Sequence, residues 1–209
     1  MSFRKDFLPI DTEEVKISDA YNAINNGDIL MCSGNYYFAN MIKKVTQSIW
    51  SHTAFMIKAP LIEKVLVCES VESIGTRIVS LDSYFNNYNG SGEAYDGFLC
   101  VVRHKDFNEG MAKKIALKAV DLMGHPYDYQ EIARIAEKIT IGGFIKNLTG
   151  DTTCELTLPD DDKKYICSEF VYECFKAAGL LLKVNCLGFM SPADLCFSED
   201  LDLIFKIVK

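Results

Sequence analysis

The chain has 209 residues, a length suited to one compact domain that folds without disulfides or a structural metal. Hydrophobic residues make up 49% and charged residues 24% of it, which excludes a wholly disordered or low-complexity protein. The 29 acidic residues outnumber the 22 Lys and Arg, and no basic stripe offsets the net charge of −7, so we expect no nucleic-acid partner.

The N-terminal part of the chain predicts an extension followed by the start of a domain. Residues 11–26 carry a weak helical pattern of apolar side chains that ends in a turn-forming Asn-Asn-Gly sequence. We therefore expect residues 1–26 to form a helical extension packed on a domain that spans 27–209. A short apolar strand over 28–33 and a helix over 36–49 begin that domain.

The middle of the chain is rich in short strands. Runs of β-branched and aromatic residues, bounded by turn signals, span 51–58, 64–70, 76–80 and 98–103. Strands this close together leave no room for crossover helices, so the pattern predicts an antiparallel rather than a doubly wound parallel sheet.

The C-terminal half is mainly helical. Apolar residues recur in helical register over 108–123, where Asn108 is the predicted N-cap and a Gly-His-Pro sequence ends the helix. A polar insertion loop is expected around 146–164. Further helices and a closing strand are predicted over 129–145, 168–178 and 203–208. This order of elements predicts an α+β fold, with an antiparallel sheet packed against helices.

Cysteine spacing and hydropathy indicate the compartment. None of the eight cysteines pairs at the two-to-four-residue spacing with which zinc sites usually begin. The chain shows no apolar run of signal-peptide length at its start, and no stretch near the ~18 apolar residues of a membrane span. We therefore expect reduced cysteines, no metal or cofactor, no transmembrane segment and a cytoplasmic location, with peripheral membrane contact left open.

Two polar residues occur in otherwise apolar predicted strands. His52 begins the 51–58 strand, in which both faces are apolar, so its ring is expected to be partly buried and to need hydrogen-bond partners. Glu69 lies on the apolar 64–70 strand, where a carboxylate is costly unless it is paired or reaches solvent at the strand end. If Glu69 is paired, the two side chains can face each other across an antiparallel ladder, with Cβ atoms roughly 5 Å apart.

A third candidate lies where the polar loop gives way to the last predicted helix. Cys167 shares the inward face of that helix with Val171, Cys174 and Ala178. A helix N-terminus lowers the pKa of a thiol and offers N–H groups to a developing oxyanion. Cys167 is either one more buried thiol or, if it meets His52 and Glu69 in space, the nucleophile of a catalytic triad.

Six short sequences then occur in a characteristic order. They are Gly27-Asp28-Ile29-Leu30, Trp50-Ser51-His52-Thr53-Ala54, Glu69-Ser70, Gly124-His125-Pro126-Tyr127-Asp128, Cys167-Ser168-Glu169-Phe170-Val171 and Ser191-Pro192-Ala193-Asp194. The series resembles the circularly permuted branch of the NlpC-type papain-like hydrolases, the YiiX/YebB-like group, which is distantly related to the lecithin:retinol acyltransferases. It covers residues 27–196, and the histidine precedes the cysteine by roughly 115 residues, as in the permuted branch.

The resemblance implies a circularly permuted papain-like fold and a role for each site residue. Cys167 would be the nucleophile at a helix N-terminus, His52 the base and Glu69 the residue that orients the imidazole. Backbone N–H groups near Cys167 and Ser168 would form the oxyanion hole, and Tyr127 would line the pocket. Ser51, next to the histidine, is a further substrate-binding candidate.

The expected activity is hydrolysis of an amide or isopeptide bond in a peptide-like substrate through a thioester intermediate. A first alternative is a thioesterase or acyltransferase that acts on an acyl-lipid, with the aromatic residues Tyr36, Tyr37, Phe38 and Trp50 as acyl contacts. A second alternative is a catalytically inactive binding module of the same fold. A metal-dependent hydrolase is disfavoured, since the chain has only three histidines and none are close in sequence.

Overall fold

The computed structural model describes residues 12–135, 137, 163–182, 190–196 and 198–209. The predicted insertion loop around 146–164 therefore lies outside the described residues, except for its last two lysines, and so does the second half of the predicted helix over 129–145.

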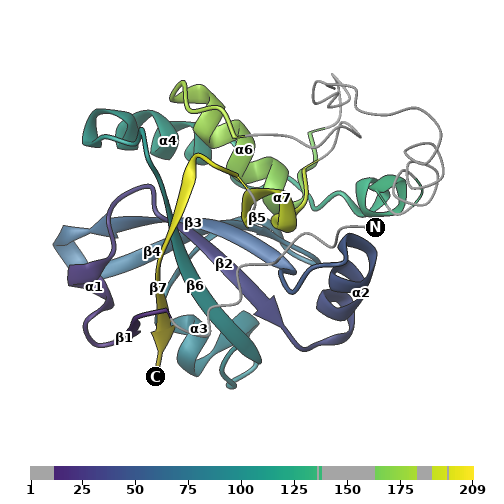
Figure 1. Ribbon diagram of the computed structural model, residues 1–209, viewed down its shortest axis with the longest axis horizontal. Coiled ribbons are helices and arrows are strands. Elements are labelled where there is room, and N and C mark those ends of the chain that lie inside the picture. Colours follow the sequence, from purple (N-terminus) through teal and green to yellow (C-terminus); the bar gives the residue numbers. More distant parts are fainter. Residues whose placement is uncertain (1–11, 136, 138–162, 183–189, 197) are drawn as a thin grey trace.

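The described residues form one seven-stranded sheet (Figure 1). Its strands are β1 (Glu14–Lys16), β2 (Ile29–Gly34), β3 (His52–Ala59), β4 (Lys64–Val71), β5 (Gly75–Ser80), β6 (Gly97–His104) and β7 (Leu201–Val208). They lie in the order β1-β7-β6-β2-β3-β4-β5, and every neighbouring pair is antiparallel except β1 and β7. Together with the helices, this sheet confirms the predicted α+β class.

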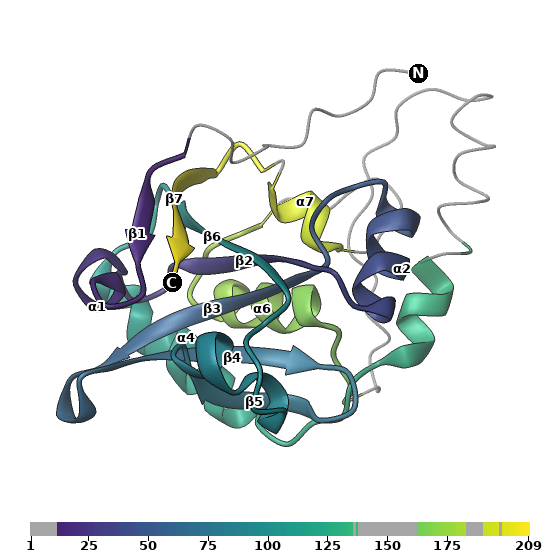
Figure 2. The same cartoon turned by 90° about the horizontal axis from the view of Figure 1, so that it is seen from below.

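Helices cover both faces of the sheet. They are α1 (Ala20–Ala23), α2 (Tyr37–Thr46), α3 (Ser83–Asn86), α4 (Glu109–Asp121), α6 (Cys167–Ala177) and α7 (Pro192–Cys196), and residues 129–135 are also helical. Helices α4 and α6 pack on one face, and α1 and α3 pack on the other (Figures 1 and 2). Short 3-10 turns span Pro60–Ile62 and Tyr88–Gly90.

Alternation along the central strands divides the core into two clusters. On β2, Ile29 and Met31 belong to the cluster beneath α4 and α6, whereas Leu30 and Cys32 belong to the cluster on the opposite face. Because both faces are covered, β2 is buried at every position, and Ser33 is its one polar residue. The central strands therefore lie within the core, and β3 carries the first candidate site residue.

The clearest difference from the sequence prediction lies in the N-terminal extension. The pattern over 11–26 predicted a helix, but the structure has a strand, β1, followed by the four-residue helix α1. Strand β1 pairs in parallel with β7, and the Ile17 N–H donates to the Val208 carbonyl at 2.8 Å. Pairing with β7 gives the backbone of β1 hydrogen-bond partners. A weakly amphipathic helix in this segment would have been stabilised by local propensity alone.

Helix boundaries follow the local signals more closely. Helix α2 ends three residues earlier than predicted because Gln47 adopts a left-handed conformation, with φ of 51°. The Asn108 side chain accepts a hydrogen bond from the Gly110 N–H at 3.1 Å and caps α4 as predicted. In the part of the chain that is described, no helix has the length and hydropathy needed to cross a membrane.

Candidate active site

Cys167 is the first residue of α6, and local hydrogen bonds fix where that helix starts. Ile166 is extended, and its N–H donates to the Glu169 carboxylate at 3.1 Å. The Ser168 hydroxyl donates to the Met190 carbonyl at 2.6 Å, which ties the first turn to the segment before α7. The apolar face of α6 packs against β3 and β4 and so fixes the position of its N-terminus, where Cys167 is 2% exposed.

His52 and Glu69 come together on the sheet. Phe55 pairs with Cys68 in the β3–β4 ladder, which places His52 and Glu69 on the same face but on a diagonal. They meet across the ladder as predicted, but on a diagonal and not at directly opposite positions, and a diagonal is within reach of long side chains. His52 Nε2 and Glu69 Oε2 are 2.7 Å apart, and the residues are 3% and 0% exposed.

The side chain of Cys167 lies near the His52 ring and interacts with it, since Cys167 is one of the groups that raise the pKa of the ring. Since Nε2 is engaged by Glu69, the nitrogen that remains for the thiol is Nδ1. Burial opposes a charge on His52, but the hydrogen bonds and negative charges of Cys167 and Glu69 outweigh it and raise the pKa of the ring to about 10. This arrangement favours a protonated imidazole beside the sulfur of Cys167.

Glu69 is held by two further residues that sequence reasoning missed. Arg77, directly opposite Glu69 on β5, donates from Nε to Glu69 Oε1 at 2.9 Å. The hydroxyl of Tyr84, on α3, donates to Glu69 Oε2. Burial raises the pKa of Glu69, but the contacts with His52, Arg77 and Tyr84 lower it by a larger amount. The net pKa is below its ordinary value, so the carboxylate stays ionised. An arginine in the strand after the buried glutamate was the available sequence signal.

The three other predicted site residues have different surroundings. The Ser51 hydroxyl accepts from the Gly34 N–H at 2.9 Å and donates to the Cys32 carbonyl, so it links β2 to the start of β3. The Ser168 side chain is likewise engaged by Met190, which leaves only its backbone N–H for an oxyanion. Tyr127 packs edge-to-face against Phe38 and is 6% exposed.

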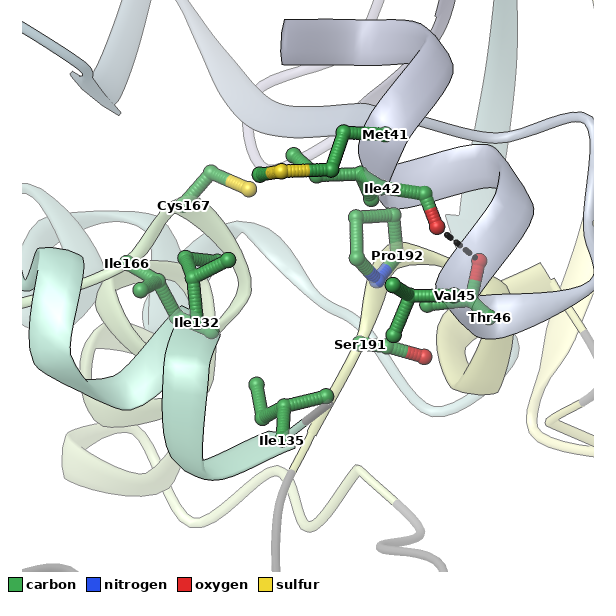
Figure 3. A pocket seen from close by; sticks show the side chains of 10 residues that line it. All are labelled: Met41, Ile42, Val45, Thr46, Ile132, Ile135, Ile166, Cys167, Ser191 and Pro192. Atoms are coloured by element: carbon green, nitrogen blue, oxygen red, sulfur yellow. Dashed lines mark hydrogen bonds between the residues drawn. The ribbon is translucent and has the colours of Figure 1, made fainter. Parts of the chain in front are cut away.

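A pocket opens beside Cys167, between α2 and the helix at 129–135 (Figure 3). It encloses about 370 Å³, part of it open to solvent, and its lining is Met41, Ile42, Val45, Thr46, Ile132, Ile135, Ile166, Cys167, Ser191 and Pro192. The Cys167 sulfur points toward Met41 and Ile42. The hydroxyls of Thr46 and Ser191 donate to the Ile42 carbonyl and the Asp194 carboxylate, so the lining is effectively aliphatic.

The aromatic residues expected to contact an acyl chain do not form this lining. Trp50 is fully buried in the core and packs against Phe98. Tyr37 is 87% exposed, and Phe38 packs with Tyr127 and Tyr129. The helical period explains the difference, since on α2 it is Met41, Ile42 and Val45 that turn toward the pocket.

A comparison with solved structures shows which fold this chain resembles. The crystal structure of metalloprotein YiiX from Escherichia coli O157:H7 superposes with a TM-score of 0.61 over 88% of this chain and 98% of that chain, at 17% identity. This chain has the YiiX fold. No family model matches the sequence, and no curated protein matches it.

The name of this neighbour raises the question of a metal in the present chain. In the described part of the chain, no three His, Cys, Asp or Glu side chains are grouped so that they could hold a metal ion. The described residues therefore do not fit a metal site, and Cys167, His52 and Glu69 are the groups available for catalysis.

Proposed function

We propose that the protein is a cysteine hydrolase that works through a thioester intermediate. The observation that carries the proposal is the series of neighbouring side chains Glu69, His52 and Cys167. Cys167 lies at the N-terminus of α6 and lines a pocket. The order of histidine before cysteine and the YiiX fold support the further proposal that the fold is a circularly permuted, NlpC-type papain-like one.

The proposed steps use only these groups and water. The Cys167 thiolate adds to the substrate carbonyl carbon, and backbone N–H groups at the start of α6 stabilise the oxyanion. His52 gives its proton to the leaving amine or alcohol as the thioester forms, and Glu69 holds the ring in place. His52 then takes a proton from water, the resulting hydroxide cleaves the thioester, and the acid leaves as thiolate and imidazolium re-form.

The bond that is cleaved can be an amide or isopeptide, as the resemblance implies, or an ester or thioester of an acyl-lipid. The aliphatic lining beside Cys167 favours the acyl-lipid, because such a lining offers an acyl chain apolar contact and offers a peptide-like crosslink few polar partners. Acyl transfer to an acceptor other than water would use the same thioester.

Thiol labelling separates the enzyme from an inactive binding module. Burial raises the pKa of Cys68 and Cys100 to about 12, so these thiols should react slowly near neutral pH. We expect iodoacetamide at about pH 6 to modify Cys167 selectively, as read by peptide mass spectrometry, and His52→Ala to abolish that selectivity. Uniform slow labelling of all eight cysteines would instead indicate a binding module.

Trapping the intermediate identifies the bond. A panel of activated peptide esters and fatty-acyl esters should leave an acyl group on Cys167, and the mass of the adduct names the class. Val45→Trp, which fills the pocket, should abolish capture of the fatty-acyl group while Cys167 still reacts with iodoacetamide. Val120→Trp on the exposed face of α4 is the matched control and should change neither reaction.

A further inference from the structure

The Glu69 carboxylate is gripped from three separate elements. Oε2 accepts from His52 on β3 and from Tyr84 on α3, and Oε1 accepts from Arg77 on β5. Glu69 is 0% exposed, so water contributes nothing to its solvation and these donors must replace it. A carboxylate used only to orient a histidine needs one of these contacts, which leaves the other two to be explained.

Arg77 is itself held in place. It lies directly opposite Glu69 in the β4–β5 register, and only 15% of its side chain is exposed. Its Nη2 donates to the Asn89 side chain, and its guanidinium lies over the Tyr88 ring, 6.0 Å from the centroid. The charge beside Glu69 is therefore fixed in position.

These contacts extend the site into a row of alternating charges: Arg77, Glu69, His52 and Cys167. We propose that Arg77 and Tyr84 are positioning residues that keep Glu69 ionised and fixed, and so maintain the Cys167 thiolate through His52. The inference rests on the proposed function, because it assigns these two residues to the same nucleophile. Neither residue touches the pocket lining, so both act through Glu69.

The direction of the effect follows from the charges. Arg77 and the Tyr84 hydroxyl both lower the pKa of Glu69 against the effect of burial. Removing the positive charge of Arg77 should therefore raise the pKa of Glu69. As the pH falls, Glu69 would then take up its proton earlier, His52 would lose its counter-charge, and the reactivity of Cys167 that depends on His52 would be lost at a higher pH.

The test is the pH profile of Cys167 alkylation by iodoacetamide, followed by peptide mass spectrometry from about pH 4 to 9. We expect Arg77→Gln to move the acid midpoint to a higher pH and Arg77→Lys to restore most of the wild-type midpoint. Tyr84→Phe, which removes one hydroxyl, should move it in the same direction by less. Arg103→Gln is the matched control, because it breaks another buried Arg–carboxylate pair, with Asp28, and should leave the midpoint unchanged.

The outcomes separate this inference from the proposed function. If wild-type Cys167 reacts selectively and depends on His52, but Arg77→Gln and Tyr84→Phe keep the wild-type midpoint, the inference is overturned and the hydrolase proposal stands. If wild-type Cys167 shows no His52-dependent reactivity, both fail. If circular dichroism shows Arg77→Gln to be unfolded, the Arg77→Lys and Tyr84→Phe profiles decide.

Discussion

Replacing Glu69 by Gln tests whether the buried carboxylate is ionised and paired with Arg77 and His52. Gln keeps the size of the side chain but removes the negative charge that Arg77 and His52 share. Arg77 would then be a guanidinium with 15% side-chain exposure and no opposite charge at Oε1. The Gln amide would also turn its NH₂ toward a donor, either Arg77 or the His52–Tyr84 side, so at least one hydrogen bond is lost in either orientation.

The magnitude follows from the burial of the pair. Breaking a buried ion pair by removing one partner costs about 3–5 kcal/mol. For a chain of this length, 1 kcal/mol lowers the melting temperature by about 2–4 °C, so we expect a fall of about 6–20 °C at neutral pH. Because the contacts lower the pKa of Glu69 in the fold, its stabilisation is present above the ordinary value of 4.5 and is lost as the pH falls below it.

Differential scanning calorimetry of wild type and Glu69→Gln from about pH 3 to 8 measures both expectations. The control is Glu14→Gln, which breaks the Glu14–Lys206 pair, whose side chains are 57% and 29% exposed. A surface pair of this kind is worth about 0–1 kcal/mol, so the control should shift the melting temperature by no more than about 4 °C.

A Glu69→Gln protein that melts within the range of the control would refute the reasoning, because Glu69 would then be neutral or unpaired in the fold. A difference between Glu69→Gln and wild type that stays constant down to about pH 3 would also contradict it, since the lowered pKa requires that difference to shrink in acid.

Three further predictions concern pH and packing. Although burial opposes a charge on His52, Cys167 and Glu69 raise its pKa from 6.5 to about 10. The stabilisation by the charged ring is therefore complete below pH 6.5 and declines toward pH 10. His52→Gln should flatten the dependence of melting temperature on pH over that window, and an unchanged slope would contradict the raised pKa. Burial raises the pKa of Glu169 from 4.5 to about 8, so its ionisation costs stability as the pH rises between these values. Glu169→Gln should therefore match the melting temperature of wild type below pH 4.5 and exceed it above pH 8. Equal melting temperatures above pH 8 would contradict the raised pKa of Glu169. At Gly75, with φ of +85°, a Cβ atom would lie 2.1 Å from the His125 carbonyl oxygen, whereas at Gly90, with φ of +77°, it would meet nothing within 4 Å; Gly75→Ala should therefore melt well below Gly90→Ala, and equal losses would rule out the close contact.

Sequence patterns were reliable wherever a single element decides the outcome. Alternation placed His52 in a buried strand, and the structure has it as the first residue of β3, 3% exposed. The change from polar loop to apolar period placed Cys167 at the beginning of a helix, and α6 begins at that residue. Where the local signal was weak, over 11–26, pairing with β7 overrode it and produced β1.

Sequence patterns failed where the outcome depends on how elements meet. Periodicity gives the face of a strand but not its register, so the diagonal offset of His52 and Glu69 was not foreseen. Arg77 and Tyr84 became partners of Glu69 only because β5 pairs beside β4 and α3 follows at its end. The pocket likewise joins side chains from four segments, so aliphatic residues line it in place of the expected aromatic ones.

The sequence by itself indicated most of the elements, the α+β class and the three candidate site residues, because hydrophobic periodicity and helix-capping chemistry act over a few neighbouring residues. Tertiary structure alone decided that a thiol and an imidazole separated by roughly 115 residues come close enough to interact. It also decided that the carboxylate behind them is clamped by an arginine and a tyrosine. Such contacts depend on strand register and helix packing, which are set by the burial of the whole core rather than by any local run of residues.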